Sequence, residues 1–269
     1  MPPWLTGLLI GFTACLLLAG GLAVWAYQRF VVLRERARRA ERLAELGTLT
    51  GGLAHEIKNP LSTIQLNLQL LEEDLPGESV VGARVINRLR TVRSEASRLR
   101  ETLDDFLRYA GKMELEREPT DLNRLIDEIG DFFHPQAAVH GVKLRIDLAP
   151  KPIVANVDPK FVKQAVLNLM LNATQAMSGP DRAGGELIIQ TRQLDGHAFI
   201  DVTDTGPGID AERLPKIFEA YFTTKKGGTG LGLPMTRRIA EEHGGHVSVA
   251  SEVGRGTKFT LKFPVGNIA

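Results

Sequence analysis

The chain begins with its longest apolar stretch. No charged residue occurs between Trp4 and Ala26, and arginines follow from Arg29 onward. In a helix with a rise of about 1.5 Å per residue, this stretch would extend about 34 Å, enough for a bilayer core of about 30 Å. No Lys or Arg precedes it. We therefore predict one transmembrane helix over residues 4–26, with the N-terminus outside and the rest of the chain in the cytoplasm.

A cleaved signal peptide is the alternative interpretation of this stretch. It is disfavoured because no basic region precedes the stretch, the stretch is long, and no clear cleavage site follows it. About three residues would remain outside the membrane, too few for an external sensor domain. Residues 27–45 are rich in Arg, Glu and Ala, which favours a charged helical linker.

Two apolar stripes with helical spacing follow this linker. The first is Leu46, Leu49, Leu53, Ile57, Leu61, Ile64, Leu68, Leu71 and Leu75. Pro76-Gly77 ends it. The second is Val85, Leu89, Val92, Ala96, Leu99, Leu103, Phe106 and Ala110. Its steps alternate between four and three residues, as in heptad repeats. The two stripes predict a helical hairpin over residues 46–110.

One hairpin cannot cover both of its apolar stripes. Two hairpins can cover each other in a four-helix bundle, so we predict a homodimer. The alternative is a hairpin that packs on the rest of its own chain, which the regular heptads disfavour.

The pattern changes after Gly111 and becomes mixed. Helices are predicted over 122–139, with Asp121 as a cap, over 159–177 after Asp158-Pro159, and over 234–243. Strands are predicted over 142–148, 153–157, 187–192, 198–203, 246–251 and 257–263. This order predicts an α/β sandwich with helices on one face of a mixed sheet. The fold class as a whole is therefore α+β and multi-domain.

Composition adds few constraints. The hydrophobic fraction of 43% is ordinary, and a net charge of +1 gives no sign of a nucleic-acid partner. Cys15 is the only cysteine, so neither an internal disulfide nor a cysteine metal site is expected.

The run from His55 to Pro60 carries the first candidate chemistry. A neutral imidazole is a nucleophile, and the adjacent Glu56 can raise its basicity through a hydrogen bond. Asn59 lies one helical turn beyond His55, where an amide can orient a water molecule. Pro60 removes one helical hydrogen bond and bends the helix. The other five histidines are interpreted as ordinary surface or core residues.

A second group of residues is suited to holding a nucleotide. Asn168 and Asn172 share a helix face, and their side-chain oxygens can ligate Mg²⁺. Asp204 follows a strand, where a carboxylate can accept from an exocyclic amine such as that of adenine. Gly206 and Gly208 let the backbone approach a ligand. Taken alone, the asparagines could instead serve helix–loop contacts, and the glycines a simple turn.

Phosphate-binding features come next along the chain. Lys225 or Lys226 can place a positive charge beside a γ-phosphate. A glycine-rich run then precedes a helix, whose free amides can hold phosphate. This run comprises Gly228, Thr229, Gly230, Leu231 and Gly232. Its spacing differs from that of a P-loop or a dinucleotide fingerprint.

In this order, the motifs closely resemble those of bacterial two-component sensor histidine kinases, over about residues 43–264. His55–Pro60 resembles the phosphoacceptor box, Asn168–Ala176 the N box, and Asp204–Gly208 the adenine-binding box. Phe218–Lys225 resembles the F box, Gly228–Leu233 the glycine box at the end of the nucleotide lid, and Gly254–Thr257 a further signature. The second domain would then share the ATPase fold of gyrase and Hsp90.

The resemblance implies ATP and Mg²⁺ as cofactors, autophosphorylation to give phosphohistidine at His55, and transfer to an aspartate of a response regulator. It implies a dimerisation and phosphotransfer domain over 46–110 and a catalytic ATP-binding domain over 114–266. Glu56 and Asn59 resemble the phosphatase motif of the family. Phe218 and Thr257 join the residues predicted to bind ATP. The location implied is the inner membrane.

The chain departs from the family in three places. Ala220 and Tyr221 replace the usual Pro and Phe of the F box. Gln175 stands where many members carry a basic residue near the phosphates, which makes Lys225 the better candidate for that cation. The usual sensor domains do not accompany these motifs, so the signal would come from a separate sensory protein, from the membrane or from a part of the protein outside this sequence.

Two other function classes remain as alternatives. A degenerate kinase would act as a scaffold, but every motif position is filled. An ATPase would use water as the acceptor, but the His55 box and the heptad hairpin disfavour it. Whether phosphorylation occurs in cis or in trans is open.

Overall fold

The computed structural model describes residues 53, 57–71, 81–178, 184–225 and 228–265, together with Trp25, Tyr27, Arg29 and Phe30. The chain divides into two compact units, Met1–Ala54 and His55–Ala269. Among the described residues, no helix is long and apolar enough to cross a membrane. Apart from Trp25, the predicted span over 4–26 lies outside these residues, as do His55 and Glu56.

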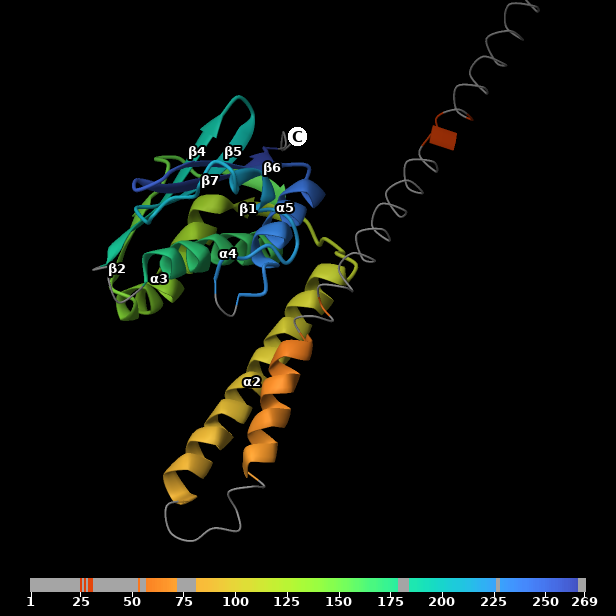
Figure 1. Cartoon of the computed structure of the whole chain (residues 1–269). Helices are drawn as coiled ribbons and strands as arrows, with labels where there is room; N and C mark the ends of the chain where they lie inside the picture. Colours follow the sequence, from red (N-terminus) through yellow and green to blue (C-terminus); the bar gives the residue numbers. More distant parts are fainter. Residues whose placement is uncertain are drawn as a thin grey trace, which may run out of the picture. The chain divides into compact units, whose positions relative to one another are not determined.

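A helical hairpin opens the second unit. One helix covers residues 57–71, and α2 covers Val81–Ala110. They lie side by side and run in opposite directions (Figure 1), and the Arg88 guanidinium donates to the Leu70 carbonyl. The helical part of the predicted fold is thereby confirmed.

The heptad stripes of the hairpin split into two lines. In α2, Val85, Val92, Leu99 and Phe106 are half-buried, whereas Leu89, Ala96 and Leu103 are exposed. The shorter helix repeats this division: Ile57, Ile64 and Leu71 are covered, and Leu61 and Leu68 are exposed. Each helix therefore turns one heptad position toward its neighbour and leaves the other on the surface.

The rest of the unit is an α/β sandwich. Its main sheet has the order β2-β4-β5-β7-β6. These strands are β2 (Val142–Asp147), β4 (Gly185–Leu194), β5 (His197–Asp204), β7 (Gly256–Pro264) and β6 (His246–Glu252). The β2–β4 pair is parallel and the others are antiparallel. The predicted mixed sheet is confirmed.

Three helices cover one face of this sheet (Figure 1): α3 (Leu122–Val139), α4 (Pro159–Met177) and α5 (Gly232–Glu242). The carboxylate of Asp121 accepts from the Asn123 amide, and that of Asp158 from the Lys160 amide, so both predicted caps are present. The core forms where the helices meet the sheet; Phe133, Leu169, Ile189 and Leu261 have no exposed surface there. The third helix begins two residues before the predicted start at Pro234.

The predicted strand over 153–157 does not join the main sheet. It is β3 (Val154–Val157), which pairs with β1 (Glu118–Asp121) in a separate two-stranded sheet. The strand β1 was not predicted, because its residues, Glu-Pro-Thr-Asp, show no apolar alternation. A short 3₁₀ turn, η1 (Leu214–Lys216), completes the described elements.

Candidate functional site

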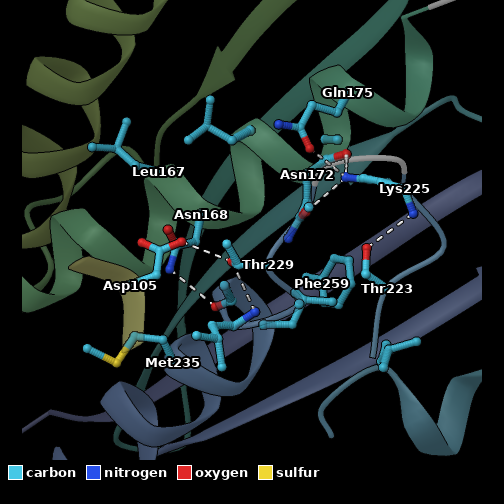
Figure 2. Close-up of a pocket in the computed structure, with 18 of the residues that line it drawn as sticks. Asp105, Leu167, Asn168, Asn172, Gln175, Thr223, Lys225, Thr229, Met235 and Phe259 are labelled. Atoms are coloured by element: carbon cyan, nitrogen blue, oxygen red, sulfur yellow. Dashed lines mark hydrogen bonds between the residues drawn. The ribbon is translucent and has the colours of Figure 1, made fainter. Parts of the chain in front are cut away.

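A cavity of about 1460 Å³ lies beside α4 and brings together most of the predicted nucleotide-binding residues. Figure 2 shows Asn168, Asn172, Lys225 and Thr229 around it. The predicted residues that line it are Asn168, Asn172, Asp204, Gly208, Lys225, Gly228, Thr229, Gly230, Leu231, Gly232 and Thr257. They come from α4, the end of β5 and the loop after it, the segment from Lys225 to the first residue of α5, and the start of β7.

The two asparagines face the cavity because the other side of α4 is buried in the core. Leu169, Met170 and Ala173 occupy that buried side. The Asn168 side-chain amide donates to the Gly232 carbonyl over 3.2 Å. This bond attaches α4 to the first turn of α5 and brings both asparagines close to the glycine-rich segment.

Lys225 projects its ammonium group onto α4. It donates to the main-chain oxygen of Asn172 at 3.2 Å, to Asn172 Oδ1 at 2.9 Å and to Gln175 Oε1 at 2.9 Å. Burial lowers the pKa of Lys225 to about 8, and the Asp204 carboxylate opposes this change. A cation is therefore present at the end of the cavity where the amide oxygens lie. Lys226, the other candidate cation, is outside the described residues.

Asp204 is the buried carboxylate of the site, with 5% of its surface exposed. It accepts from the Gly206 amide at 2.8 Å and from the backbone of Thr257, its neighbour on β7. Burial raises the pKa of Asp204, although these two hydrogen bonds and Lys225 favour its charged form. Gly206 therefore orients the carboxylate and does not itself line the cavity.

Gly208 meets protein backbone on one side, although it also lines the cavity. Its φ is 72°, and a Cβ atom there would lie 2.2 Å from the Glu252 carbonyl oxygen. The motif predicts a glycine at this position that lets the backbone approach a ligand. In the structure, the close approach of β6 already requires it.

The glycine-rich segment contacts the rest of the protein at Tyr221 and at α2. Gly230 has a φ of 67°, and a Cβ there would lie 2.6 Å from the carbonyl carbon of Tyr221. The Thr229 hydroxyl accepts from the Leu231 amide at 3.5 Å and donates to Asp105 Oδ2 at 2.9 Å. This second bond connects the segment to α2.

Asp105 was not among the predicted site residues. An acidic residue on a heptad helix has the pattern of an ordinary solvated face, so its sequence carries no sign of the contact. Asp105 and Glu101 both line the cavity from α2.

Phe218 lies behind the cavity and does not line it. Its ring meets the Phe259 ring edge-on, with centroids 6.4 Å apart, and the Arg237 guanidinium lies 5.8 Å from its centroid. Phe259 lines the cavity. Phe218 therefore supports the wall from behind.

Only part of the predicted phosphoacceptor run is described. Asn59 is exposed on the helix over 57–71, and Pro60 is buried within the same helix. The geometry at His55 and Glu56 lies outside the described residues.

The donor set suits a magnesium ion. Amide oxygens are hard ligands of the kind that Mg²⁺ prefers, and Asn172 Oδ1 already faces a cationic group, the Lys225 ammonium. Within the described ranges, no group of three or more His, Cys, Asp or Glu side chains is suited to holding a metal.

Two family models match the chain. The His Kinase A (phospho-acceptor) domain matches residues 45–112, and the histidine kinase-, DNA gyrase B- and HSP90-like ATPase matches residues 157–267.

Named relatives share these regions. Sensor histidine kinase ZraS of Escherichia coli strain K12 is 35% identical over 256 residues, which cover 94% of this chain and 53% of ZraS. Sporulation kinase E of Bacillus subtilis strain 168 is 32% identical over 234 residues, covering 87% of this chain and 30% of that kinase. The chain thus spans about half the length of ZraS.

Solved structures show the same arrangement of the chain. Histidine kinase ThkA in complex with the response regulator protein TrrA matches with a TM-score of 0.71 and 27% identity, covering 87% of this chain and 66% of that one. Full-length ShkA in complex with AMPPNP matches with a TM-score of 0.60 and 26% identity, covering 81% of this chain and 45% of ShkA.

Proposed function

The chain belongs to the two-component sensor histidine kinases, and we propose that it phosphorylates itself on His55 with ATP and passes the phosphoryl group to an aspartate of a response regulator. The observation that carries this proposal is the cavity itself. A buried carboxylate, two amide side chains, a lysine and a helix N-terminus converge there. The AMPPNP bound to ShkA and the regulator bound to ThkA support it.

Each part of the cavity has a separate task in this proposal. Asp204 accepts a hydrogen bond from the exocyclic amine of adenine. The amides of the glycine-rich segment, at the N-terminus of α5, hold phosphate oxygens. The Lys225 ammonium offsets their negative charge.

Asn168 and Asn172 would hold Mg²⁺. When bound, the ion would supply positive charge beside the phosphate groups and so stabilise negative charge that develops during the transfer.

The chemical step is a phosphoryl transfer. A ring nitrogen of His55 attacks the γ-phosphorus, the bond to the β,γ-bridging oxygen breaks, and ADP leaves with that oxygen. The Glu56 carboxylate accepts a hydrogen bond from the N–H of the other ring nitrogen, which makes the attacking nitrogen more nucleophilic. An aspartate oxygen of the regulator then attacks the same phosphorus, which regenerates His55.

The direct test uses γ-labelled ATP and Mg²⁺ with the full chain. Label that is stable in alkali and lost in acid identifies phosphohistidine, and we expect His55→Gln to abolish it while ATP still binds. Release of free phosphate alone would instead identify an ATPase, and the absence of both products a scaffold.

We also propose that Asn59 positions water for dephosphorylation of the regulator. Asn59 is exposed on its helix, as access to a partner requires. Asn59→Ala should spare autophosphorylation and slow the loss of phosphate from the regulator. Loss of autophosphorylation in this variant would instead assign Asn59 to the kinase step.

Membrane anchoring through residues 4–26 and homodimerisation through the hairpin complete the proposal. The uncharged N-terminal stretch supports the first, and the exposed apolar lines of the hairpin support the second. If the stretch is an anchor, the full chain stays in the membrane fraction after an alkaline wash. A chain that begins at residue 30 should then be released.

A further inference from the structure

Gln175 lies on α4 at the end of the cavity where Lys225 reaches the helix (Figure 2). We propose that Gln175 is a positioning residue that holds the Lys225 ammonium where the phosphate tail of the nucleotide binds. This inference rests on the proposed ATP-binding function and adds a residue to which that function gives no role.

The three oxygens around the Lys225 ammonium differ in what else they must do. One is the main-chain oxygen of Asn172, and the second is Asn172 Oδ1, a candidate magnesium ligand. The third is Gln175 Oε1, at 2.9 Å. When Asn172 Oδ1 turns to a metal ion, Gln175 Oε1 can still hold the ammonium.

A neutral acceptor suits this task better than a charged one. A lysine or arginine at 175 would repel the Lys225 ammonium at this separation, and a carboxylate would neutralise its charge. The glutamine oxygen accepts the hydrogen bond and leaves the positive charge available for phosphate. Residues 175 and 225 therefore work as a pair in which α4 supplies the acceptor and the segment before the glycines supplies the cation.

The first test replaces the acceptor in the full chain. Gln175→Leu has similar size and cannot accept a hydrogen bond, and the side chain is exposed, so no core contact is lost. Calorimetry with Mg²⁺ should show ATP binding about fivefold to tenfold weaker, the loss expected for one ordinary solvent-exposed hydrogen bond. Binding of adenosine, which has no phosphate, should be unchanged.

Gln193→Leu is the matched control, because Gln193 is exposed on β4 and does not line the cavity. It should bind both ligands as the wild type does. Unchanged ATP binding by Gln175→Leu would show that Gln175 has no role in binding. Tighter binding would show that Gln175 holds Lys225 away from the phosphates. Either result would overturn the proposal. Failure of the wild type to bind ATP would instead contradict the proposed function.

The second test exchanges the two side chains, so that residue 175 carries the ammonium group and residue 225 the amide. Lys225→Gln alone should weaken ATP binding and leave adenosine binding unchanged. Adding Gln175→Lys returns an ammonium to the same place, now carried by α4, and should recover at least half of the lost binding free energy. A double variant no better than Lys225→Gln would show that the two side chains do not share one position and would refute the pairing.

Discussion

Asp204 is buried, and two backbone hydrogen bonds favour its negative charge. Its carboxylate receives the amides of Gly206 and Thr257 and lines the cavity. In Asp204→Asn, an NH₂ group replaces one carboxylate oxygen. A hydrogen-bond donor then faces the adenine amine, which is itself a donor and needs an acceptor. We expect ATP and ADP binding to weaken about tenfold to a hundredfold, the range for one mismatched buried hydrogen bond of about 1–3 kcal/mol.

Calorimetric titration of both nucleotides measures this effect. Asp195→Asn, at the exposed turn between β4 and β5, is the control for loss of one carboxylate and should leave the affinity unchanged. An unaltered dissociation constant for Asp204→Asn would show that Asp204 does not contact the base.

His243 makes stability depend on pH. It is buried, Nε2 accepts from the Asp158 amide at 2.9 Å, and Nδ1 lies 2.7 Å from the Ile239 carbonyl oxygen, to which it donates. Burial lowers its pKa from 6.5, although the bond with Ile239 opposes the change. The unfolded chain thus takes up this proton at a higher pH than the folded one. The contribution of His243 is complete above pH 6.5 and is lost as the pH falls toward the lowered pKa.

Urea unfolding between about pH 5 and pH 7 tests this dependence. His243→Leu should be less stable throughout but should show a flatter fall in unfolding free energy below pH 6.5. His134→Gln removes an exposed histidine and should keep the wild-type slope. Equal slopes for His243→Leu and the wild type would assign the pH dependence to other groups.

The sequence could predict the position of some site residues but not of others. Lys225 and Asp204 stand in recognisable motifs, so their approach to one cavity could be expected. Asp105 carries no such signal, and the motif that contains Gln175 does not indicate its hydrogen bond to Lys225, because these contacts join segments 124 and 50 positions apart. The position of Phe218 behind the wall depends on packing against Phe259, which local sequence does not specify.

At the scale of elements, the glycine-rich segment offers a matched comparison. Gly230 and Gly196 have nearly the same φ, 67° and 69°. A Cβ at Gly230 would lie 2.6 Å from Tyr221 backbone, whereas a Cβ at Gly196 has nothing within 4 Å. Both substitutions by alanine carry the same backbone strain of about 1–2 kcal/mol, but only Gly230→Ala must also displace its neighbour.

We therefore expect Gly230→Ala to weaken ATP binding at least about tenfold, since the amides of that segment would shift. Gly196→Ala should lower the melting temperature by a few degrees and bind ATP normally. Calorimetry and thermal unfolding of the two variants separate the effects. Normal ATP binding by Gly230→Ala would mean that the conformation of this glycine does not position the phosphate site.

Elements with strong periodicity were predicted well. The heptads placed α2, and the Asp-Pro start placed α4, because local propensity and tertiary packing agree there. The strand β1 was missed since it consists of four polar or conformationally restricted residues that acquire strand geometry by pairing with β3. Sheet order also depends on contacts between distant segments and could not be obtained from periodicity.

At the scale of the whole molecule, the membrane anchor, the bounds of the two domains after it and the cellular location stay predictions. The hairpin gives the most direct experimental access to the assembly. Its lines of exposed apolar residues, Leu89, Ala96 and Leu103 on α2 and Leu61 and Leu68 on the shorter helix, are the surface that the proposed homodimer would cover.

Leu103→Glu tests that dimer. Leu103 is 42% exposed in the single chain, so a glutamate there can be solvated and the hairpin itself should still fold. In a four-helix bundle the same position would be buried, and an unpaired charge would oppose association. We expect the dissociation constant of the dimer to rise at least about a hundredfold, measured by sedimentation equilibrium in detergent.

Leu194→Glu is the matched control, because Leu194 is 55% exposed and belongs to β4, not to the hairpin. It should associate like the wild type, and both variants should retain wild-type helix content by circular dichroism. If Leu103→Glu dimerised as tightly as the control, the exposed heptad line would not be the dimer contact. The regular heptads of α2 would then need another partner to cover them, either within the chain or outside it.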